Sequence, residues 1–416
     1  METGAGQKLL IAGSFCNVGG GWCQTVRRVY CLYWRFLDGA GRELQVGGVE
    51  TYLWQLTRLC ADLGYEPVVV QSADIPFDRS FDHLRVIGVD TSGINTRRVP
   101  RVLFKAIAPN LQRDDILIFG ADHCSVPVGP FKAISIQHGV FWDLPCRFLT
   151  NRRIAHSGLF GSWYKMHVAH QARRLFENCD TRVCVDHNFL NWYRTLRSGP
   201  PGGDNWVIPN FTELAPPAKA ATLPGTQDQI SILFARRFVE YRGTKLMAAA
   251  TSQLLSEYPR VTFTFAGDGP DSSWLRTRFD GCDRVDFIRY HPKDALGQVL
   301  RHDISVIPSL ASEGTSLAVA EAMGAGRVVV ASHVGGITNM IIDNYNGLLV
   351  IPEVLALVAA LRTAIGDPGL RRRLGSAAYE TASRAFGIST WRASWSNVIR
   401  AFERRRACMV SPQGSK

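Results

Sequence analysis

The sequence lacks the short motifs that most often reveal an enzyme class. It contains no Asp-x-Asp pair, P-loop, nucleophile elbow or zinc-ligand spacing. Its ten cysteines form no Cys-x-x-Cys pair, which is typical of reduced thiols in a cytosolic protein. No apolar run approaches the roughly 20 residues that a membrane-spanning helix needs. These absences argue against P-loop nucleotide hydrolases, serine hydrolases, zinc proteins and integral membrane proteins.

The composition is that of a globular protein with an excess of basic residues. The chain has 416 residues, of which 46% are hydrophobic and 20% are charged, so we expect two or three domains. Its net charge of +11 favours an acidic partner, such as a nucleotide, a phospholipid or a nucleic acid. The first residues, METGAGQKLLIAGSF, carry an acid before their only lysine, and we expect a first strand there and not a signal peptide.

Short apolar strands alternate with helical patterns through the first half. We expect a helix over residues 49–63, ending at Gly64, and strands at PVVVQS, DDILIFG, AISIQHG and TRVCVD. This alternation predicts a parallel sheet with helices on both faces, whose ligand binds beyond the carboxyl ends of the strands. Residues 17–45, which are rich in aromatic residues and arginine, are interpreted as an insert after the first strand.

The alternation repeats in a second half, after a change in composition. Residues 212–229, TELAPPAKAATLPGTQDQ, are rich in proline, alanine and threonine, as linkers are. We therefore expect a first domain at 1–211, a linker at 212–229 and a second domain at 230–385, each of Rossmann type.

The most informative stretch is a strand–helix–strand unit in the second half. A helix is expected from about Ser316 to Met323, with Thr315 or Ser316 as its N-cap, and the free N–H groups of its first turn would face an anion. Glu313 and Glu321 lie roughly 10 Å apart along the axis, and a diphosphate fits between them. The alternative is an ordinary unit of this kind with two solvated glutamates.

This stretch, EGTSLAVAEAM followed by glycines, VVAS and GG, resembles the double-glutamate motif of retaining GT-B glycosyltransferases of family 4, the glycosyl transferases of group 1. The resemblance implies a GT-B fold, with two Rossmann-like domains facing across a cleft and a C-terminal helix, 386–416, that crosses back to the first. It implies transfer of a hexosyl group from a nucleotide-diphosphate sugar to a hydroxyl, with retention of configuration and no metal or other cofactor. Glu321 would bind ribose, Glu313 would orient sugar hydroxyls, and backbone groups of the segment between them would hold sugar or phosphate: Gly314, Thr315, Ser316 and Leu317.

Other positions match the same family pattern. Gly47 and Gly48 stand where the family has a glycine-rich loop facing donor and acceptor. His138, at a strand end, stands where similar transferases have a histidine beside the donor sugar. Gly267 and Gly269 fit the family's glycine turn.

Two arginines are predicted to neutralise the diphosphate. Arg237 matches the arginine of the family's Gly-Arg pair, and Arg242 stands for its lysine, whereas Arg236 replaces the glycine. The sequence leaves open whether Arg236 or Arg237 faces the diphosphate. Val328 replaces a common proline and Asn339 a common glutamate, and these departures put the identity of the sugar in doubt.

Three segments mix aromatic residues with cations, which favours a membrane surface. Residues 148–175 hold five Lys/Arg, three His and no acid, and residues 384–416 hold seven Lys/Arg against one acid. The insert adds further residues of both kinds: Trp22, Arg27, Arg28, Tyr30, Tyr33, Trp34, Arg35 and Phe36. We therefore expect a cytoplasmic protein, attached peripherally to the cytosolic face of the inner membrane. Its acceptor would be a glycan or a polyprenyl-linked glycan of bacterial surface polysaccharide synthesis, such as O-antigen or exopolysaccharide.

Three alternatives remain at this point. A sugar-nucleotide epimerase or hydrolase could share the fold, and so could a non-catalytic scaffold that binds sugar nucleotides. The positive charge would also suit a nucleic-acid-binding protein, but no binding motif appears, and we expect no nucleic-acid partner. The sequence does not give the sugar, the base, the acceptor, the linkage or the oligomeric state.

Overall fold

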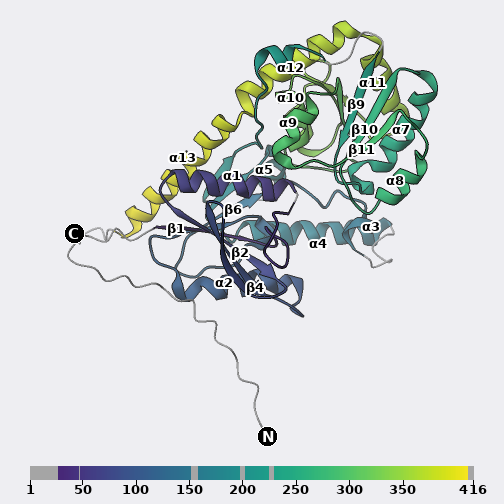
Figure 1. The fold of residues 1–416 in the computed structure, drawn as a ribbon. Coiled ribbons are helices and arrows are strands. Elements are labelled where there is room, and N and C mark those ends of the chain that lie inside the picture. The colour runs from purple at the N-terminus through teal and green to yellow at the C-terminus, as the bar shows by residue number, and fades with distance from the viewer. Residues whose placement is uncertain (1–26, 46, 151–157, 197–201, 224–228, 411–416) are drawn as a thin grey trace.

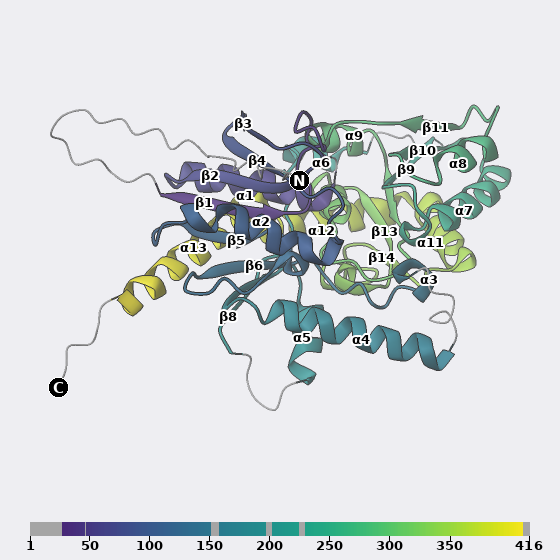
Figure 2. The same cartoon turned by 90° about the horizontal axis from the view of Figure 1, so that it is seen from below.

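The structure consists of two α/β domains and a long C-terminal helix. The computed structural model describes residues 27–45, 47–150, 158–196, 202–223 and 229–410. Figures 1 and 2 show helix α13 (Ile388–Val410) leaving the second domain and running along the first. The two-domain α/β architecture that the alternating pattern predicted is confirmed.

The first domain is built on an eight-stranded sheet in the order β3-β4-β2-β1-β5-β6-β7-β8. Neighbouring strands are parallel, except that β3 runs antiparallel to β4. The strands are β1 (Arg28–Tyr33), β2 (Glu66–Ala73), β3 (Phe77–Phe81), β4 (Leu84–Asp90), β5 (Ile116–Phe119), β6 (Ala133–Gln137), β7 (Thr181–Cys184) and β8 (Asp204–Val207). The described helices of this domain are α1 (Gly48–Asp62), α2 (Val99–Ile107), α3 (Cys146–Leu149), α4 (Gly158–Phe176) and α5 (His187–Thr195).

The central strand β1 lies inside the segment that was interpreted as an insert, so that interpretation is wrong. β1 pairs with β2 on one side and with β5 on the other. Its side chains alternate between the two faces of the sheet, because successive residues of a strand point in opposite directions. Val29 and Cys31 join the core that includes α1 and α13, whereas Tyr30 and Leu32 join the core beneath α2. The first strand predicted at KLLIAGSF lies outside the described residues.

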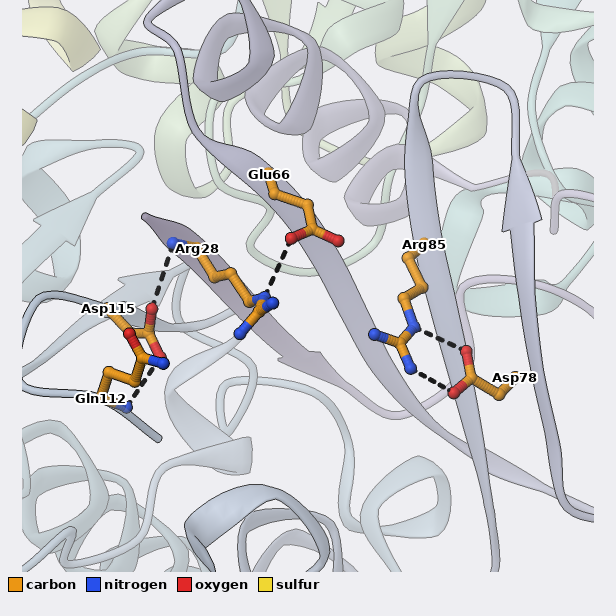
Figure 3. Close-up of polar contacts among 6 residues, drawn as sticks. All are labelled: Arg28, Glu66, Asp78, Arg85, Gln112 and Asp115. Atoms are coloured by element: carbon orange, nitrogen blue, oxygen red, sulfur yellow. Dashed lines mark hydrogen bonds and ion pairs between the residues drawn. The ribbon is translucent and has the colours of Figure 1, made fainter. Parts of the chain in front are cut away.

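Ion pairs and a backbone hydrogen bond link neighbouring strands of this sheet (Figure 3). The Arg28 guanidinium on β1 donates to Glu66 on β2 at 2.9 Å, and the Arg28 backbone N–H donates to the Asp115 carboxylate at 3.1 Å. Arg85 on β4 forms a two-point pair with Asp78 on β3. Arg28 therefore has a structural role here, and its charge is partly neutralised.

The second domain contains a six-stranded, fully parallel sheet in the order β11-β10-β9-β12-β13-β14. Its strands are β9 (Ile230–Ala235), β10 (Val261–Ala266), β11 (Val285–Ile288), β12 (Ile304–Ile307), β13 (Val328–Ser332) and β14 (Leu348–Val350). One face packs on α7, α8 and α11 and the other on α9, α10 and α12. The helices are α6 (Pro217–Ala221), α7 (Thr244–Glu257), α8 (Ser272–Arg278), α9 (Ala295–Val299), α10 (Leu317–Gly324), α11 (Val354–Gly366) and α12 (Pro368–Ala385).

The segment between the domains is docked on the second domain where it is described. The Ala215 N–H donates to the Gly324 carbonyl at the end of α10, at 3.0 Å. The buried guanidinium of Arg327 donates to the carbonyls of Lys219 and Thr222, around the short helix α6. The described part of the predicted linker thus follows the surface of the second domain and is not a free spacer.

In two of the three segments predicted to contact a membrane, several aromatic residues are buried and several cations pair with acids of the protein. Tyr30 and Phe36 of the supposed insert are buried in the first domain, and so are the α13 residues Trp391 and Trp395. The cations of α13 pair with acids of the first domain: Arg392 with Asp62, Arg405 with Asp204, and Arg406 with Asp114. The expectation that these two segments face lipid is therefore wrong for these residues. Their aromatic side chains pack in the core of the first domain, and aromatic residues are as typical of a core as of a membrane surface. None of the described helices is long and apolar enough to span a bilayer.

Candidate active site

The loop between β12 and α10 lies at the centre of the candidate site. Glu313 lies within the loop, four residues before α10 begins at Leu317. Ser316 is the N-cap residue, but its side chain makes no capping hydrogen bond. The first N–H groups of the helix therefore lack a side-chain cap, and an anion could accept from them.

Three charged side chains meet at this loop. The guanidinium groups of Arg236 and Arg242 lie 2.5 Å and 2.7 Å from Oε1 of Glu313. The side chains of Arg236 and Glu313 are 8% and 7% exposed, so this pair is almost completely removed from water. Burial alone would raise the pKa of Glu313, but the two guanidinium groups hold it well below its usual value. The cluster thus carries two fixed positive charges and one negative charge.

The structure answers which of the two adjacent arginines points inward. Arg236 reaches Glu313 and also donates to the Ser316 hydroxyl at 3.3 Å, whereas Arg237 is exposed. Burial raises the pKa of Glu50, and the nearby charge of Arg237 offsets a small part of that increase. The predicted Arg242 lies in the cluster, and Arg236 joins it where the family match had pointed to Arg237.

The second predicted glutamate has a different environment. Burial raises the pKa of Glu321 to about 7, and the nearby charge of Arg236 offsets only part of that increase. Apolar side chains line a small cavity beside it, including Leu233, Ala235 and Val299. The two glutamates are therefore unlike: Glu313 is fixed as an anion, whereas Glu321 changes its charge near neutral pH.

His138 and Gly139 bring the first domain against this loop. The Nε2 atom of His138 lies 2.8 Å from the Gly120 carbonyl, which can only accept, so Nε2 carries the proton. Burial lowers the pKa of His138 to about 4, so the ring is neutral and its Nδ1 is an acceptor. The ring packs edge-on against Tyr52 of α1, with centroids 5.3 Å apart.

Glycine is required where the two domains touch. Gly139 has φ of +118°, and a Cβ placed there would lie 2.5 Å from the Gly314 nitrogen. Gly48 faces the same helix start, since its Cβ would lie 3.5 Å from the Leu317 side chain. A side chain at position 139 would push the histidine loop away from the glutamate loop.

Gly47 and Glu50 form the start of α1. Gly47 is the N-cap residue, and a Cβ there would lie 2.1 Å from the Glu50 carboxylate. The Tyr33 hydroxyl donates to Glu50 at 3.2 Å. Glu50 was not among the predicted site residues, and its only signal in the sequence is its place directly after the glycine pair.

Gly267 and Gly269 pack against the turn after β9 that carries Arg236. Both have positive φ, +150° and +157°. A Cβ at Gly267 would lie 2.0 Å from the Arg236 carbonyl, and one at Gly269 would lie 2.3 Å from the Phe238 carbonyl. These glycines let the loop after β10 pack on the turn that carries Arg236, so they position the arginine.

Thr315 and Asn339 tie the site to the first domain. The Thr315 hydroxyl donates to the Val185 carbonyl at 2.9 Å and accepts from the Asn210 N–H at 2.8 Å. The Asn339 side chain accepts from the His187 N–H at the start of α5, at 3.2 Å. Thr315 therefore joins the domains and is not a helix cap, and Asn339 has a similar joining role.

Two further contacts close the other side of the interface. The Ser312 N–H donates to the Asp143 carboxylate at 2.7 Å, and Arg147 of α3 pairs with Glu240 at 2.8 Å. In the part of the chain that the structure describes, no group of three His, Cys, Asp or Glu side chains is arranged to hold a metal ion. Metal independence stays a prediction.

The chain is similar to known glycosyltransferases. Residues 220–381 match the family described as "Glycosyl transferases group 1". The chain is 25% identical over 333 residues to a phosphatidylinositol N-acetylglucosaminyltransferase component of Arabidopsis thaliana, covering 77% of this chain and 71% of that protein. It is 28% identical over 280 residues to glycogen synthase of Mycobacterium tuberculosis, covering 64% of this chain and 65% of that protein. The chain therefore spans about two thirds of the length of these curated relatives.

Solved structures share the fold. Sucrose-phosphate synthase of Thermosynechococcus elongatus superposes with a TM-score of 0.72 at 19% identity, covering 91% of this chain and all of the other. HepE of Anabaena in complex with UDP-glucose superposes with a TM-score of 0.67 at 16% identity, covering 90% of this chain and 99% of the other. The predicted GT-B fold is confirmed by this likeness.

Proposed function

We propose that this chain, a GT-B glycosyltransferase whose residues 220–381 belong to the group 1 family, transfers a hexosyl group from a nucleotide-diphosphate sugar to a hydroxyl of a glycan or lipid-linked acceptor, with retention of configuration. The observation that carries the proposal is the convergence of Arg236 and Arg242 on buried Glu313, at the start of α10. Two cations against one anion leave a net positive charge where a diphosphate would lie.

The arginine cluster suits the chemistry of sugar transfer. Negative charge grows on the leaving diphosphate as the bond to the sugar breaks, and positioned cations stabilise that charge most strongly in a buried site. Guanidinium groups bind phosphate oxygens at two points and keep their charge at every working pH. The cluster therefore supplies the role that a divalent ion plays in metal-dependent transferases.

The remaining residues fit roles around the sugar and the nucleoside. Glu321 would accept hydrogen bonds from the ribose hydroxyls. The neutral ring of His138 offers Nδ1 as an acceptor for a sugar hydroxyl. The leaving phosphate would accept the proton of the attacking hydroxyl, so the mechanism needs no separate base.

The nature of the acceptor is proposed from the relatives. One is the phosphatidylinositol N-acetylglucosaminyltransferase component of Arabidopsis thaliana. Another is a lipopolysaccharide core biosynthesis glycosyltransferase of Rhizobium meliloti, which is 28% identical over 223 residues and covers 51% of this chain and 61% of that protein. A lipid-linked acceptor at a membrane surface is consistent with both. Bacterial surface polysaccharide synthesis remains our proposed setting.

A panel of nucleotide-diphosphate sugars tests the proposal. A donor at about 100 times its Kd stabilises the folded state by about 2.7 kcal/mol, which should raise the melting temperature by roughly 5–10 °C. The donor found in this way is then incubated with acceptors, and the product is examined by NMR for its anomeric configuration. An epimerised sugar or free sugar, in place of a glycoside, would favour the epimerase or hydrolase alternative.

Single variants distinguish the proposed roles of Glu313 and Glu321. Glu321→Ala should weaken donor binding, and Glu313→Ala should mainly lower turnover, each by about 1–3 kcal/mol. Glu353→Ala is the matched control, because Glu353 is an exposed glutamate of the same domain. Control-like kinetics in both site variants would refute the site assignment.

A further inference from the structure

Helix α4 exposes a row of large apolar side chains. Leu159 is 89% exposed, Phe160 58%, Trp163 67% and Met166 71%. Leu159, Trp163 and Met166 are spaced by four and three residues, which places them on one face of a helix. Soluble surfaces carry single exposed apolar residues, but a contiguous group of this kind marks an interaction site.

The opposite face of α4 is fixed to the protein. Gly161, Ala169, Ala172 and Phe176 are buried, and they also follow helical spacing. Phe176 packs on the rings of α5, with its centroid 4.7 Å from that of Phe189. The helix is thus anchored by one side, and its apolar row points away from the protein.

The free face also carries an exposed cation, Arg174, whereas Lys165 contacts Asp143 and Arg173 pairs with Glu177. Helix α4 contains Lys165, Arg173 and Arg174 and no acidic residue. Arg174 is exposed and lies on the face of the apolar row by helical spacing, as does exposed His170. Apolar and aromatic residues in the first turns, followed by exposed Arg174 in the last turn, complement the head-group region of an anionic bilayer.

We propose that this face of α4 docks the enzyme on an anionic lipid bilayer, with the apolar row among the head groups. This inference deepens the proposed function and rests on it for the lipid-linked acceptor. A stable protein partner is less suited to this face. Its four side chains are 58–89% exposed and, at about 150–250 Å² for a fully exposed large side chain, offer roughly 450–700 Å², against about 800 Å² per partner in a standard interface.

Helix α4, which carries the docking face, is linked through its anchored side to the loop of the candidate site. Lys165 of α4 donates to the Asp143 carbonyl at 3.1 Å, and the Asp143 carboxylate accepts from Ser312, the residue before Glu313. Figures 1 and 2 show α4 extending along the first domain towards α3 and the second domain. A bilayer on this face would therefore present the head group of a lipid-linked acceptor close to the glutamate loop.

Vesicle flotation tests the proposal on the full chain. Wild-type protein should bind vesicles of phosphatidylcholine with phosphatidylglycerol at low salt, and less in high salt or with phosphatidylcholine alone. The triple variant Leu159→Gln/Trp163→Gln/Met166→Gln should lose about tenfold or more in the partition coefficient. Arg174→Glu should weaken binding to anionic vesicles only. A melting temperature equal to that of the wild type shows that each variant is folded.

The matched control changes two apolar residues that are equally exposed elsewhere. Ile351 and Leu355 of the second domain are 63% and 77% exposed, and the variant Ile351→Gln/Leu355→Gln should bind vesicles like the wild type. Equal binding by the triple variant and the wild type would overturn the proposal, and so would an equal loss in the control. The wild type could instead fail to bind vesicles and form dimers that the triple variant does not form. That result would overturn the proposal and assign this face to self-association.

The same variants separate this proposal from the proposed function. Flotation is measured without donor, and stabilisation by nucleotide-diphosphate sugars is measured without vesicles. A triple variant that floats normally while donors stabilise it refutes only the docking face. A wild type that floats through α4 while no nucleotide sugar stabilises it refutes only the transferase assignment.

Discussion

The adjacent residues Arg236 and Arg237 allow a sharp test of the site. The Arg236 guanidinium lies 2.5 Å from the Glu313 carboxylate, and its side chain is 8% exposed, whereas Arg237 is exposed. A hydrogen bond to a charged group contributes about 1.5–3 kcal/mol, so Arg236→Ala should lower kcat/KM roughly 10- to 150-fold. Arg237→Ala, an exposed change, should stay within about 0.5 kcal/mol, which is roughly twofold.

The assay is release of nucleoside diphosphate under conditions where kcat and KM are both determined. Arg236→Lys should recover part of the loss, because it restores the charge but not the two-point geometry of a guanidinium. Loss of fold is checked by thermal melting, and Glu313 keeps Arg242 as a partner in each variant. A larger loss in Arg237→Ala than in Arg236→Ala would refute the assignment of the inward arginine.

Three further predictions follow from the geometry. The raised pKa of Glu321 means that the folded protein holds this proton more tightly than the unfolded chain, so the stability it contributes below about pH 4.5 should be lost as pH rises towards 7. Thermal melting against pH should show this decline for the wild type and a flatter curve for Glu321→Gln, and identical curves would contradict it. Gly139→Ala should lower kcat/KM more than tenfold, about 1.4 kcal/mol, because its Cβ would meet the Gly314 backbone. The control Gly93→Ala, which has positive φ but open space, should lose only stability. Transfer should persist in excess EDTA, and a loss that magnesium or manganese restores would show that an ion neutralises the diphosphate.

The glutamate unit was predictable because its signals are local. Apolar runs that are too short for helices predicted β12 and β13, and the glycines after Met323 predicted the end of α10. Of the two predicted N-cap residues, Ser316 has that place, whereas Thr315 bonds to the first domain, a contact that no local pattern contains. Local chemistry therefore indicated the element, and only the contact between domains shows the role of Thr315.

The inward arginine could not be predicted for a geometric reason. Arg236 and Arg237 follow the last residue of β9 in a bend, where the alternation of a strand no longer decides which side chain points inward. The path of the bend depends on what packs on it, such as Gly267 against the Arg236 carbonyl. These contacts join residues far apart in the sequence, and a single sequence gives no direct measure of them.

The membrane-facing segments show a related limit. Aromatic residues mixed with arginines occur in β1, α4 and α13, and the same pattern serves both a core strand and an interfacial helix. In β1 and α13 the rings are buried and several cations have acidic partners, whereas in α4 the large apolar side chains point outward. Tertiary partners distinguish the two uses, and composition cannot.

The charge balance of the cluster explains how the site stays ordered before a donor arrives. Two guanidinium groups this close would repel each other in a poorly solvated pocket, and Glu313 offsets that repulsion by pairing with both. Each guanidinium has five N–H donors, so binding Glu313 leaves others free to take phosphate oxygens. In the proposed function, a diphosphate would bind without displacing the carboxylate, and the arginines would need little reorganisation as charge develops on the leaving group. Glu313 thus has a role in orienting the cations as well as in any contact with the sugar.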